Sequence, residues 1–183
     1  GVSLSGLANN RRKYGPGLPG IAHMRHTHIK ENFFVPGEGE HGAELAEDLA
    51  RIVAMYGAEN VAACFVEPIA GSTGVLVPPK GYLKRLREIC DQHGILLVFD
   101  EVITGFRLHL GGAQSYFGVT PDLACFGKAM ANGFPLSAIA GRADYMRQFE
   151  EVFFSFTFGG EAASIAAALA TIGMSALRPA WSP

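Results

Sequence analysis

Long runs of charge and long runs of apolar residues are both absent from this sequence. Only 17% of the 183 residues are charged, and 15 Lys and Arg against 17 Asp and Glu leave a net charge of −2. Because binding to nucleic acid or to a membrane surface depends on clustered positive charge, neither role is indicated. Charged residues or glycines interrupt every apolar stretch before it reaches the ~20 residues that span a bilayer. No membrane-spanning segment is therefore predicted.

Cysteine is scarce, and its positions do not suggest disulfide bonds. Cys64, Cys90 and Cys125 are an odd number, lie far apart, and each belongs to an apolar segment. This usage is typical of reduced, buried thiols in a cytoplasmic protein. Residues 1–15 also lack the charged region and apolar block of a signal peptide, so we expect a cytoplasmic location. A first residue other than Met, and a last stretch that breaks off after a helix-like run, suggest part of a longer chain.

Apolar residues make up 49% of the chain, which is enough for the hydrophobic core of one ordinary domain. Residues 1–40 are rich in Gly, Pro, Asn and His without periodicity, so we expect an irregular, loop-rich segment with short strands at most. Residues 41–177 alternate apolar runs with helical periodicity and are expected to form the central α/β part. Residues 178–183 are expected to be a truncated tail.

Within the central part, two kinds of pattern alternate. Helical periodicity predicts helices over residues 41–57, 81–94, 143–151 and 161–177. Short apolar runs predict strands over residues 61–68, 95–101, 121–128, 136–141 and 152–158, the last as a buried strand rather than an aromatic ligand cage. The alternation predicts an α/β fold with a mainly parallel sheet, joined by right-handed crossovers and flanked by helices on both faces.

Three ionisable residues occur where predicted strands end. Glu67 ends the first strand, Asp100 ends the second, and Lys128 follows the third. Ligands of such sheets bind at the carboxyl ends of the strands. We therefore expect these three side chains to converge on one rim of the sheet.

Asp100 and Lys128 each allow a structural and a functional interpretation. Asp100 follows five apolar residues, where it is either a turn former or a desolvated carboxylate that needs a cationic partner. Lys128 is either an exposed loop lysine or an amine desolvated among small residues, which would make it a usable nucleophile toward aldehydes. A lysine that forms a Schiff base and a carboxylate that holds a pyridinium nitrogen are the pair that pyridoxal phosphate chemistry requires.

At this point the residues resemble a known family. The stretches "FVEPIAGSTG", "LLVFDEVITGFR", "YFGVTPDLACFGKAMANGFPLSAIAGR" and "SFTFGGEAA", in this order and spacing, are similar to the class III aminotransferases, pyridoxal phosphate enzymes of fold type I. The most specific feature is the Asp-Glu-Val turn, which begins 28 residues before Lys128. The first hundred residues look most like omega-amino acid:pyruvate (beta-alanine:pyruvate) aminotransferases. The stretch from residue 105 to 141 leans toward the glutamate-1-semialdehyde aminomutases.

The resemblance implies a role for five side chains and a partner. Lys128 would form the Schiff base with pyridoxal 5'-phosphate and shuttle a proton, and Asp100 would pair with the ring nitrogen. Val102 would press on one face of the ring, and Glu67 would support the positioning of cofactor and substrate. Thr157 would reach the cofactor phosphate of a neighbouring subunit, which implies a homodimer. The substrates implied are an amino donor and a 2-oxo acid acceptor, both small molecules.

The chain also departs from the family pattern. Gly159, Gly160, Glu161 and Ala162 stand where the family commonly has Ser-Gly-Asn-Pro, which weakens the substrate assignment more than the cofactor assignment. The phosphate cradle, the aromatic residue that stacks on the ring, and the small C-terminal domain are all missing. We therefore expect this chain to be the central part of the large domain, with weak or no turnover by itself.

Alternative functions stay open at this stage. An aminomutase uses the same half-reaction as an aminotransferase, so this activity is one alternative. A non-catalytic α/β fragment is the other. A nucleotide site is disfavoured because no Walker or G-x-G-x-x-G pattern is present. Residues 71–74, "GSTG", contact substrate or merely connect elements, and Arg107 is either a carboxylate clamp or a surface residue. Four histidines lack a carboxylate or cysteine at a matching offset, so solvated loop residues are expected rather than a metal site at His23, His26, His28 and His41.

Overall fold

A computed structural model describes residues 1–177, and the expected tail of residues 178–183 lies outside this described part. Its centre is a four-stranded sheet in the order β1-β2-β3-β4. The first three strands run parallel and the fourth runs antiparallel to β3. The strands are β1 (Ala63–Val66), β2 (Leu96–Asp100), β3 (Leu123–Phe126) and β4 (Ala138–Gly141). The expected α/β fold with a mainly parallel sheet is confirmed.

The direction of β4 follows from the shortness of the segment before it. A parallel connection needs about a dozen or more residues, usually including a helix. Residues 127–137 are fewer, and four of them form a 3-10 turn, η3 (Lys128–Ala131). The chain then reverses through Asn132 and Gly133, both with positive φ. The strand that follows η3 can therefore only return alongside β3.

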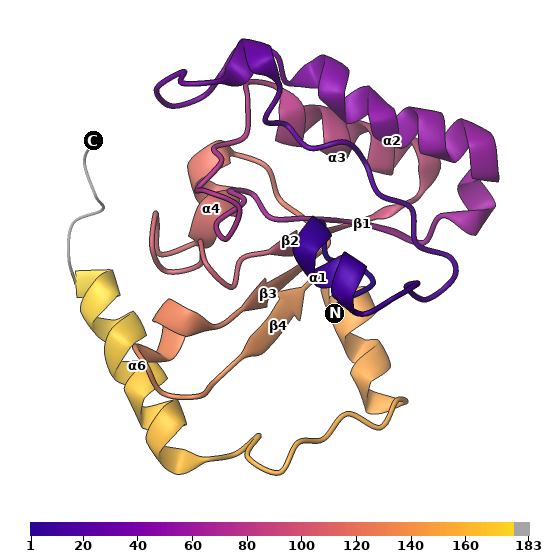
Figure 1. Cartoon of the computed structure of the whole chain (residues 1–183). Coiled ribbons are helices and arrows are strands. Elements are labelled where there is room, and N and C mark those ends of the chain that lie inside the picture. Colours follow the sequence, from indigo (N-terminus) through magenta and orange to yellow (C-terminus); the bar gives the residue numbers. More distant parts are fainter. Residues whose placement is uncertain (178–183) are drawn as a thin grey trace.

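Two amphipathic helices, α2 (Ala43–Tyr56) and α3 (Tyr82–His93), lie side by side on one face of the sheet (Figure 1). They fall where helical periodicity predicts them, and α3 ends at Gly94, whose φ of 68° gives the left-handed conformation common after helices. Their apolar faces bury the main core against the sheet. Its principal members are Leu45, Leu49, Val53, Leu83, Leu86, Ile89, Cys90, Leu97 and Phe99.

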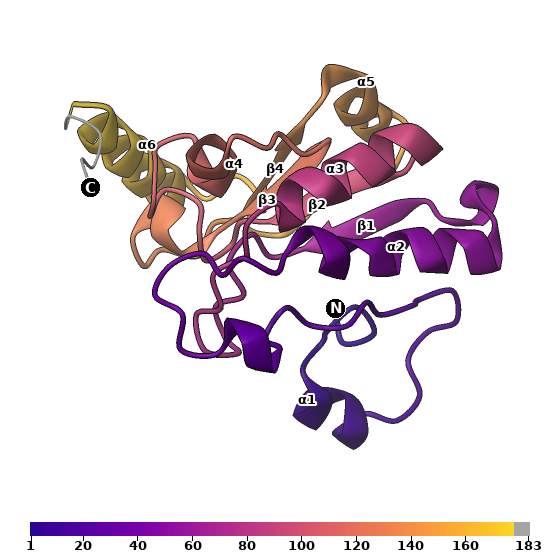
Figure 2. The same cartoon turned by 90° about the horizontal axis from the view of Figure 1, so that it is seen from above.

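The opposite face of the sheet is covered less fully than expected. Successive residues of a strand point to opposite faces, so Phe65, next to the core residue Cys64, points away from α2 and α3. Phe65 is 50% exposed, and all four residues of β4 are exposed. The long C-terminal helix α6 (Ala162–Leu177) lies on the far side of the molecule from α2 and packs against η3 (Figures 1 and 2).

The remaining elements are short. Two segments differ from expectation, namely the segment of residues 1–40, which contains a helix, and the segment of residues 143–151, where the helix is shorter than expected. Residues 1–40 contain the helix α1 (Ala8–Lys13), which Figure 2 shows apart from the sheet, and one 3-10 turn, η1 (Lys30–Asn32). The helix expected over residues 143–151 is a short α5 continued by the 3-10 turn η4. Their bounds, with those of the other short elements, are η2 (Ala58–Asn60), α4 (Gly112–Phe117), α5 (Ala143–Met146) and η4 (Arg147–Glu150).

The buried strand expected over residues 152–158 is wrong. The segment is irregular and all of it is exposed, with Phe153 at 95%. Aromatic residues favour strands only where a neighbouring strand and a packing face are present. Here the rings of Phe149, Phe154 and Phe156 instead contact one another edge to face, at centroid distances of 4.7 and 4.9 Å.

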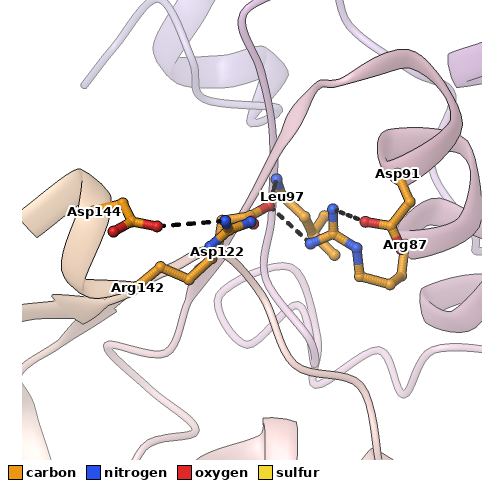
Figure 3. A network of polar contacts seen from close by, with 6 residues as sticks. All are labelled: Arg87, Asp91, Leu97, Asp122, Arg142 and Asp144. Carbon is orange, nitrogen blue, oxygen red and sulfur yellow. Dashed lines mark hydrogen bonds and ion pairs between the residues drawn. The ribbon is translucent and has the colours of Figure 1, made fainter.

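A buried aspartate ties the amino end of the sheet together (Figure 3). Asp122, just before β3, accepts hydrogen bonds from the Leu97 amide and from Arg87, both at 2.8 Å, and from Arg142 at 3.3 Å. Although burial favours the neutral acid, the hydrogen bonds from Arg87 and the Leu97 amide lower the pKa of Asp122. The carboxylate thereby joins α3, β2 and the end of β4.

Candidate active site

The carboxyl ends of the three parallel strands meet at one rim. Val66 pairs with Phe99 and Asp100 pairs with Cys125, so Glu67, one residue past β1, is level with Asp100. Lys128 follows Cys125 by three residues, which at ~3.3 Å per residue is at most about 10 Å further along. The structure thus brings Glu67, Asp100 and Lys128 to the same end of neighbouring strands.

The turn after β2 packs against the turn after β3. Oδ1 of Asp100 accepts a hydrogen bond of 3.0 Å from the Val102 amide. Val102 in turn lies against Gly127, where a Cβ atom would sit 3.5 Å from Val102 Cγ1. The side chain of Val102 therefore packs beside the residue that precedes Lys128, and the two turns form one site.

Lys128 begins η3 with a φ of 41°, in the left-handed region that a residue with a side chain seldom adopts. Phe106, whose φ is 59°, lies nearby through a contact of its ring with Phe126 at 5.6 Å between centroids. Each such residue costs about 1–3 kcal/mol and persists mainly at functional sites. Two strained residues within this rim support its interpretation as a working site.

Solvent reaches both Asp100 and Lys128, so within residues 1–177 each side chain is exposed rather than desolvated. Asp100 is exposed because it is the last residue of β2, whereas Val98, two residues earlier on the same face, is still buried. Within residues 1–177, neither side chain forms an ion pair. A carboxylate and an amine are therefore both free to contact one ligand.

The turn after β1 closes the rim on its other side. The Glu67 carboxylate accepts the Gly71 amide at 3.0 Å, which fixes the turn that leads into the "GSTG" segment. A side chain at Gly71 would overlap with Ile103, so this turn also packs against the turn after β2. The short hairpin between Ala70 and Leu76 follows directly and borders the site.

Thr157 is the expected site residue that the structure does not bring to this rim. It lies in the exposed, irregular segment before α6. In the part of the chain that the structure describes, its hydroxyl makes no hydrogen bond. Its placement leaves the expected contact with a neighbouring subunit as a prediction.

Glu101 is the functional candidate that sequence reasoning missed. It is fully buried, and its carboxylate accepts hydrogen bonds from the hydroxyl of Thr104 and from the amides of Ala113 and Gln114. The signal was the pair of adjacent acids, because alternation at the end of a strand sends one of two neighbours toward the core. Asp100 took the exposed side and Glu101 the buried one.

Two further groups of expected residues can be placed. All three cysteines are free, with Cys64 and Cys90 buried and Cys125 half-buried. Burial and the negative charge of Asp100 raise the pKa of Cys125. Within residues 1–177 no cluster of three metal-ligating side chains occurs, and His41 hydrogen-bonds Glu44 at 2.8 Å. In the same residues, no helix is long and apolar enough to cross a bilayer.

Several proteins resemble this chain in sequence. It is 48% identical to an omega-aminotransferase of Caulobacter vibrioides over 94% of this chain and 42% of that protein. It is 48% identical to an omega-amino acid–pyruvate aminotransferase of Pseudomonas putida over 81% of this chain and 34% of that protein. A glutamate-1-semialdehyde 2,1-aminomutase of Methanocaldococcus jannaschii is 47% identical over 93% of this chain and 38% of that protein. The chain thus spans about two fifths of its relatives' length.

Solved structures of transaminases also resemble this chain. An (S)-enantioselective omega-transaminase from Thermomicrobium roseum matches with a TM-score of 0.84 and 29% identity, over 96% of this chain and 41% of that one. An omega transaminase from Pseudomonas jessenii, in complex with PMP, matches with a TM-score of 0.82 and 30% identity, over 94% and 40%. The family model described as aminotransferase class-III matches residues 1–179. With its rim of Asp100 and Lys128, this chain belongs to the class-III aminotransferases.

Proposed function

We propose that this chain carries the cofactor site of a pyridoxal phosphate-dependent transaminase. The reaction moves an amino group from an omega-amino acid or amine to a 2-oxo acid such as pyruvate. The observation that carries the proposal is the exposure of Asp100 and Lys128 at the same end of neighbouring strands. The names of the Caulobacter and Pseudomonas relatives support the substrate class.

The residues present fit this cofactor at both ends of its ring. The backbone of Lys128 lies at most about 10 Å beyond that of Asp100 along the strand direction, and the two strands are neighbours. One pyridine ring fits between the exposed carboxylate and the exposed amine at this separation. When bound, the cofactor supplies an electron sink for the carbon that loses a proton. Asp100 keeps a proton on the ring nitrogen, because its charge and hydrogen bond favour the protonated form.

Lys128 has two tasks in this proposal. Its amine would hold the cofactor through the aldehyde carbon, and once released it would accept the proton that the substrate carbon loses and carry it to the cofactor's C4' carbon. The left-handed backbone of Lys128 directs the start of η3 away from β3. This change of direction directly after β3 supports a role for the Lys128 amine at the rim.

Two neighbouring residues position the ring and the substrate. Val102 is branched at Cβ and therefore stiff, which suits it to press on one face of the ring from beside Gly127. Glu67 is held by the Gly71 amide and borders the rim, where it supports cofactor and substrate. Neither residue has a proton to exchange in this proposal.

A homodimer completes the proposed enzyme. Thr157 reaches the cofactor phosphate of the neighbouring subunit, and its exposed segment, rich in phenylalanine, supports an interface there.

The Pseudomonas jessenii neighbour, which binds PMP, supports the cofactor class. The free thiols of three cysteines support a cytoplasmic location.

An aminomutase is the second candidate function, and a specific observation favours it. The Methanocaldococcus jannaschii relative matches 93% of this chain at 47% identity, nearly as well as the omega-aminotransferase. The two activities differ in whether the intermediate leaves before a second substrate arrives. Measuring pyruvate-dependent deamination of beta-alanine against isomerisation of glutamate-1-semialdehyde in the full-length gene product separates them.

The cofactor assignment is tested with the full-length gene product and pyridoxal phosphate. A visible absorbance band that borohydride bleaches is expected, and the reduced cofactor should remain on the peptide that contains Lys128. Lys128→Ala abolishes the band, whereas Lys84→Ala, which removes an exposed lysine of α3, leaves it unchanged. A band that persists in Lys128→Ala would contradict the assignment.

A further inference from the structure

Glu101 is an acidic side chain that is buried without a cationic partner among the described residues. It is completely inaccessible to solvent, and within residues 1–177 it forms no ion pair. Three donors replace the missing cation. The Thr104 hydroxyl donates at 2.8 Å, the Ala113 amide at 2.7 Å and the Gln114 amide at 3.0 Å. A buried carboxylate is tolerated only where such donors surround it.

Two glycines leave room for this carboxylate. A Cβ atom at Gly112 would lie 2.6 Å from Glu101 Oε1, and Gly112 has a φ of 78° that only glycine adopts without strain. A Cβ atom at Gly105 would lie 2.8 Å from the Glu101 carbonyl oxygen and 2.6 Å from the Phe126 ring. The backbone on both sides of Glu101 is therefore shaped to approach it closely.

Glu101 joins three separate segments. Its amide donates to the Cys125 carbonyl at 2.9 Å, which extends the pairing of β2 with β3 by one residue. Its carbonyl accepts the Gly105 amide at 2.7 Å and closes the turn after β2. Its carboxylate accepts the Ala113 and Gln114 amides, which have no partner within the first turn of α4.

The two neighbours of Glu101 are the residues proposed to contact the cofactor ring. Asp100 and Val102 flank it in sequence, and the Val102 amide donates to Asp100 Oδ1 at 3.0 Å. Neither neighbour is anchored to the core by its own side chain in the way that Glu101 is. The orientation of the Asp100 carboxylate at the rim therefore depends on the anchored turn between them.

From this geometry we propose that Glu101 is a positioning residue, which holds the Asp100 carboxylate in line with the cofactor's ring nitrogen. The inference rests on the proposed function. Glu101 touches neither cofactor nor substrate, and it acts through the turn of residues 100–105. Removing the Glu101 carboxylate is therefore expected to weaken binding of the natural cofactor more than binding of an analogue that lacks the ring nitrogen.

Glu101→Gln is the variant that tests this role. Glutamine keeps the shape of the side chain and one acceptor oxygen, but its amide group is a donor only. In place of Oε1 that group would face the Gln114 amide, and in place of Oε2 it would face the Ala113 amide and the Thr104 hydroxyl. At least one donor is therefore left unpaired in either orientation. The turn then loses its anchor while the core keeps its volume.

The measurement compares two ligands in the full-length gene product. One is pyridoxal phosphate, and the other is its analogue with carbon in place of the ring nitrogen. The wild-type protein is expected to bind the natural cofactor about tenfold to hundredfold more tightly than the analogue, as a charged hydrogen bond contributes. Glu101→Gln is expected to lower this ratio about fivefold or more.

The outcomes separate positioning from mere structural damage. Structural damage weakens both ligands alike and leaves the ratio within about twofold of the wild-type ratio, a range that corresponds to additive effects; that result overturns the proposal. Any larger fall supports it. Asp122→Asn is the matched control, because Asp122 is, in the described part of the chain, a second buried carboxylate that accepts a backbone amide, at the opposite end of the sheet. It leaves the ratio unchanged.

Two further results keep the test decisive. If Glu101→Gln does not fold, Thr104→Val removes one of the three donors with little change in shape and lowers the ratio about threefold; an unchanged ratio overturns the proposal. If the wild-type protein does not prefer the natural cofactor, Asp100 does not meet the ring nitrogen and the proposed function itself fails. If the wild-type protein prefers the natural cofactor and Glu101→Gln keeps the same preference, the role of Glu101 is contradicted and the proposed function is not.

Discussion

The Val102 amide donates a hydrogen bond of 3.0 Å to Oδ1 of Asp100, and Oδ2 accepts no hydrogen bond from any side chain or amide of residues 1–177. Val102 also packs beside Gly127, which precedes Lys128. The carboxylate and the amine of the proposed site are thus connected through one residue. A small change in this turn is expected to reach both of them.

Asp122→Asn is expected to lower the free energy of unfolding by about 2 kcal/mol, because the partly buried Arg87 loses its buried ionic partner and keeps only the exposed Asp91. Asp144→Asn is the control: its carboxylate pairs with Arg147 and Arg142 in solvent, and the loss should stay below about 1 kcal/mol. Urea denaturation of each variant measures both values. Equal losses would contradict the assigned importance of the Asp122 network.

The same aspartate predicts a dependence of stability on pH. The pKa of Asp122 is lower in the folded chain than its ordinary value, so its stabilising contribution is complete above the unfolded pKa of about 3.9. This contribution is lost as the pH falls through the folded pKa. Asp122→Asn should therefore lose less stability than the wild-type chain below about pH 4. Acid titrations of the two proteins, run in parallel, measure the losses, and an equal loss of stability in both would contradict the prediction.

Gly112→Ala and Gly118→Ala test the space around Glu101. Both glycines have positive φ, at 78° and 65°, but only a Cβ atom at Gly112 would meet another group, the Glu101 carboxylate. Gly118→Ala should cost about 1 kcal/mol for the backbone alone. Gly112→Ala should cost about 3 kcal/mol or more, because the collision adds to the same strain. Thermal denaturation compares them, and similar losses would count against the close approach.

The reactivity of Cys125 reports the charge of Asp100. Burial and the Asp100 carboxylate raise the pKa of this thiol, so little thiolate is present at neutral pH. Asp100→Asn removes the charge, lowers the pKa, and should speed alkylation of Cys125 about two- to fivefold. Peptide mass spectrometry follows each thiol, and the buried Cys64 and Cys90 serve as internal controls. An unchanged rate would place the Asp100 charge away from Cys125.

The 183-residue chain is expected to associate when it is produced alone. Phe153, Phe156 and Phe158 expose most of their surface in one short segment, and such patches mark interfaces or promote aggregation. Phe153→Ser with Phe156→Ser should shift sedimentation toward the monomer. A monodisperse wild-type monomer at micromolar concentration would argue against an interface at this segment.

Much of the fold could be predicted because its signals are local. The periodicity of Leu45, Leu49 and Val53 marks α2, and the apolar run before Asp100 marks β2, since both depend on residues close in sequence. The positions of Glu67, Asp100 and Lys128 at strand ends could be predicted for the same reason. Their roles in chemistry stay predictions.

Other features could not be predicted because they depend on what packs nearby. The apolar residues of 152–158 satisfy any strand pattern, yet no strand is there for them to pair with among the described residues. The direction of β4 depended on the length of the connection from β3. The exposure of Lys128 depended on what packs beside the turn after β3.

By itself, the sequence determined which segments are helices or strands in the core and which charged residues follow the strands, because side-chain periodicity and strand ends are local properties. Only the tertiary structure decided which of two adjacent acids faces solvent. From the sequence, Asp100 and Glu101 are two adjacent carboxylates that either face could receive. In the structure, the Ala113 and Gln114 amides of α4 donate to Glu101 and not to Asp100. Glu101 is buried where those donors compensate its charge, and Asp100 is left at the rim.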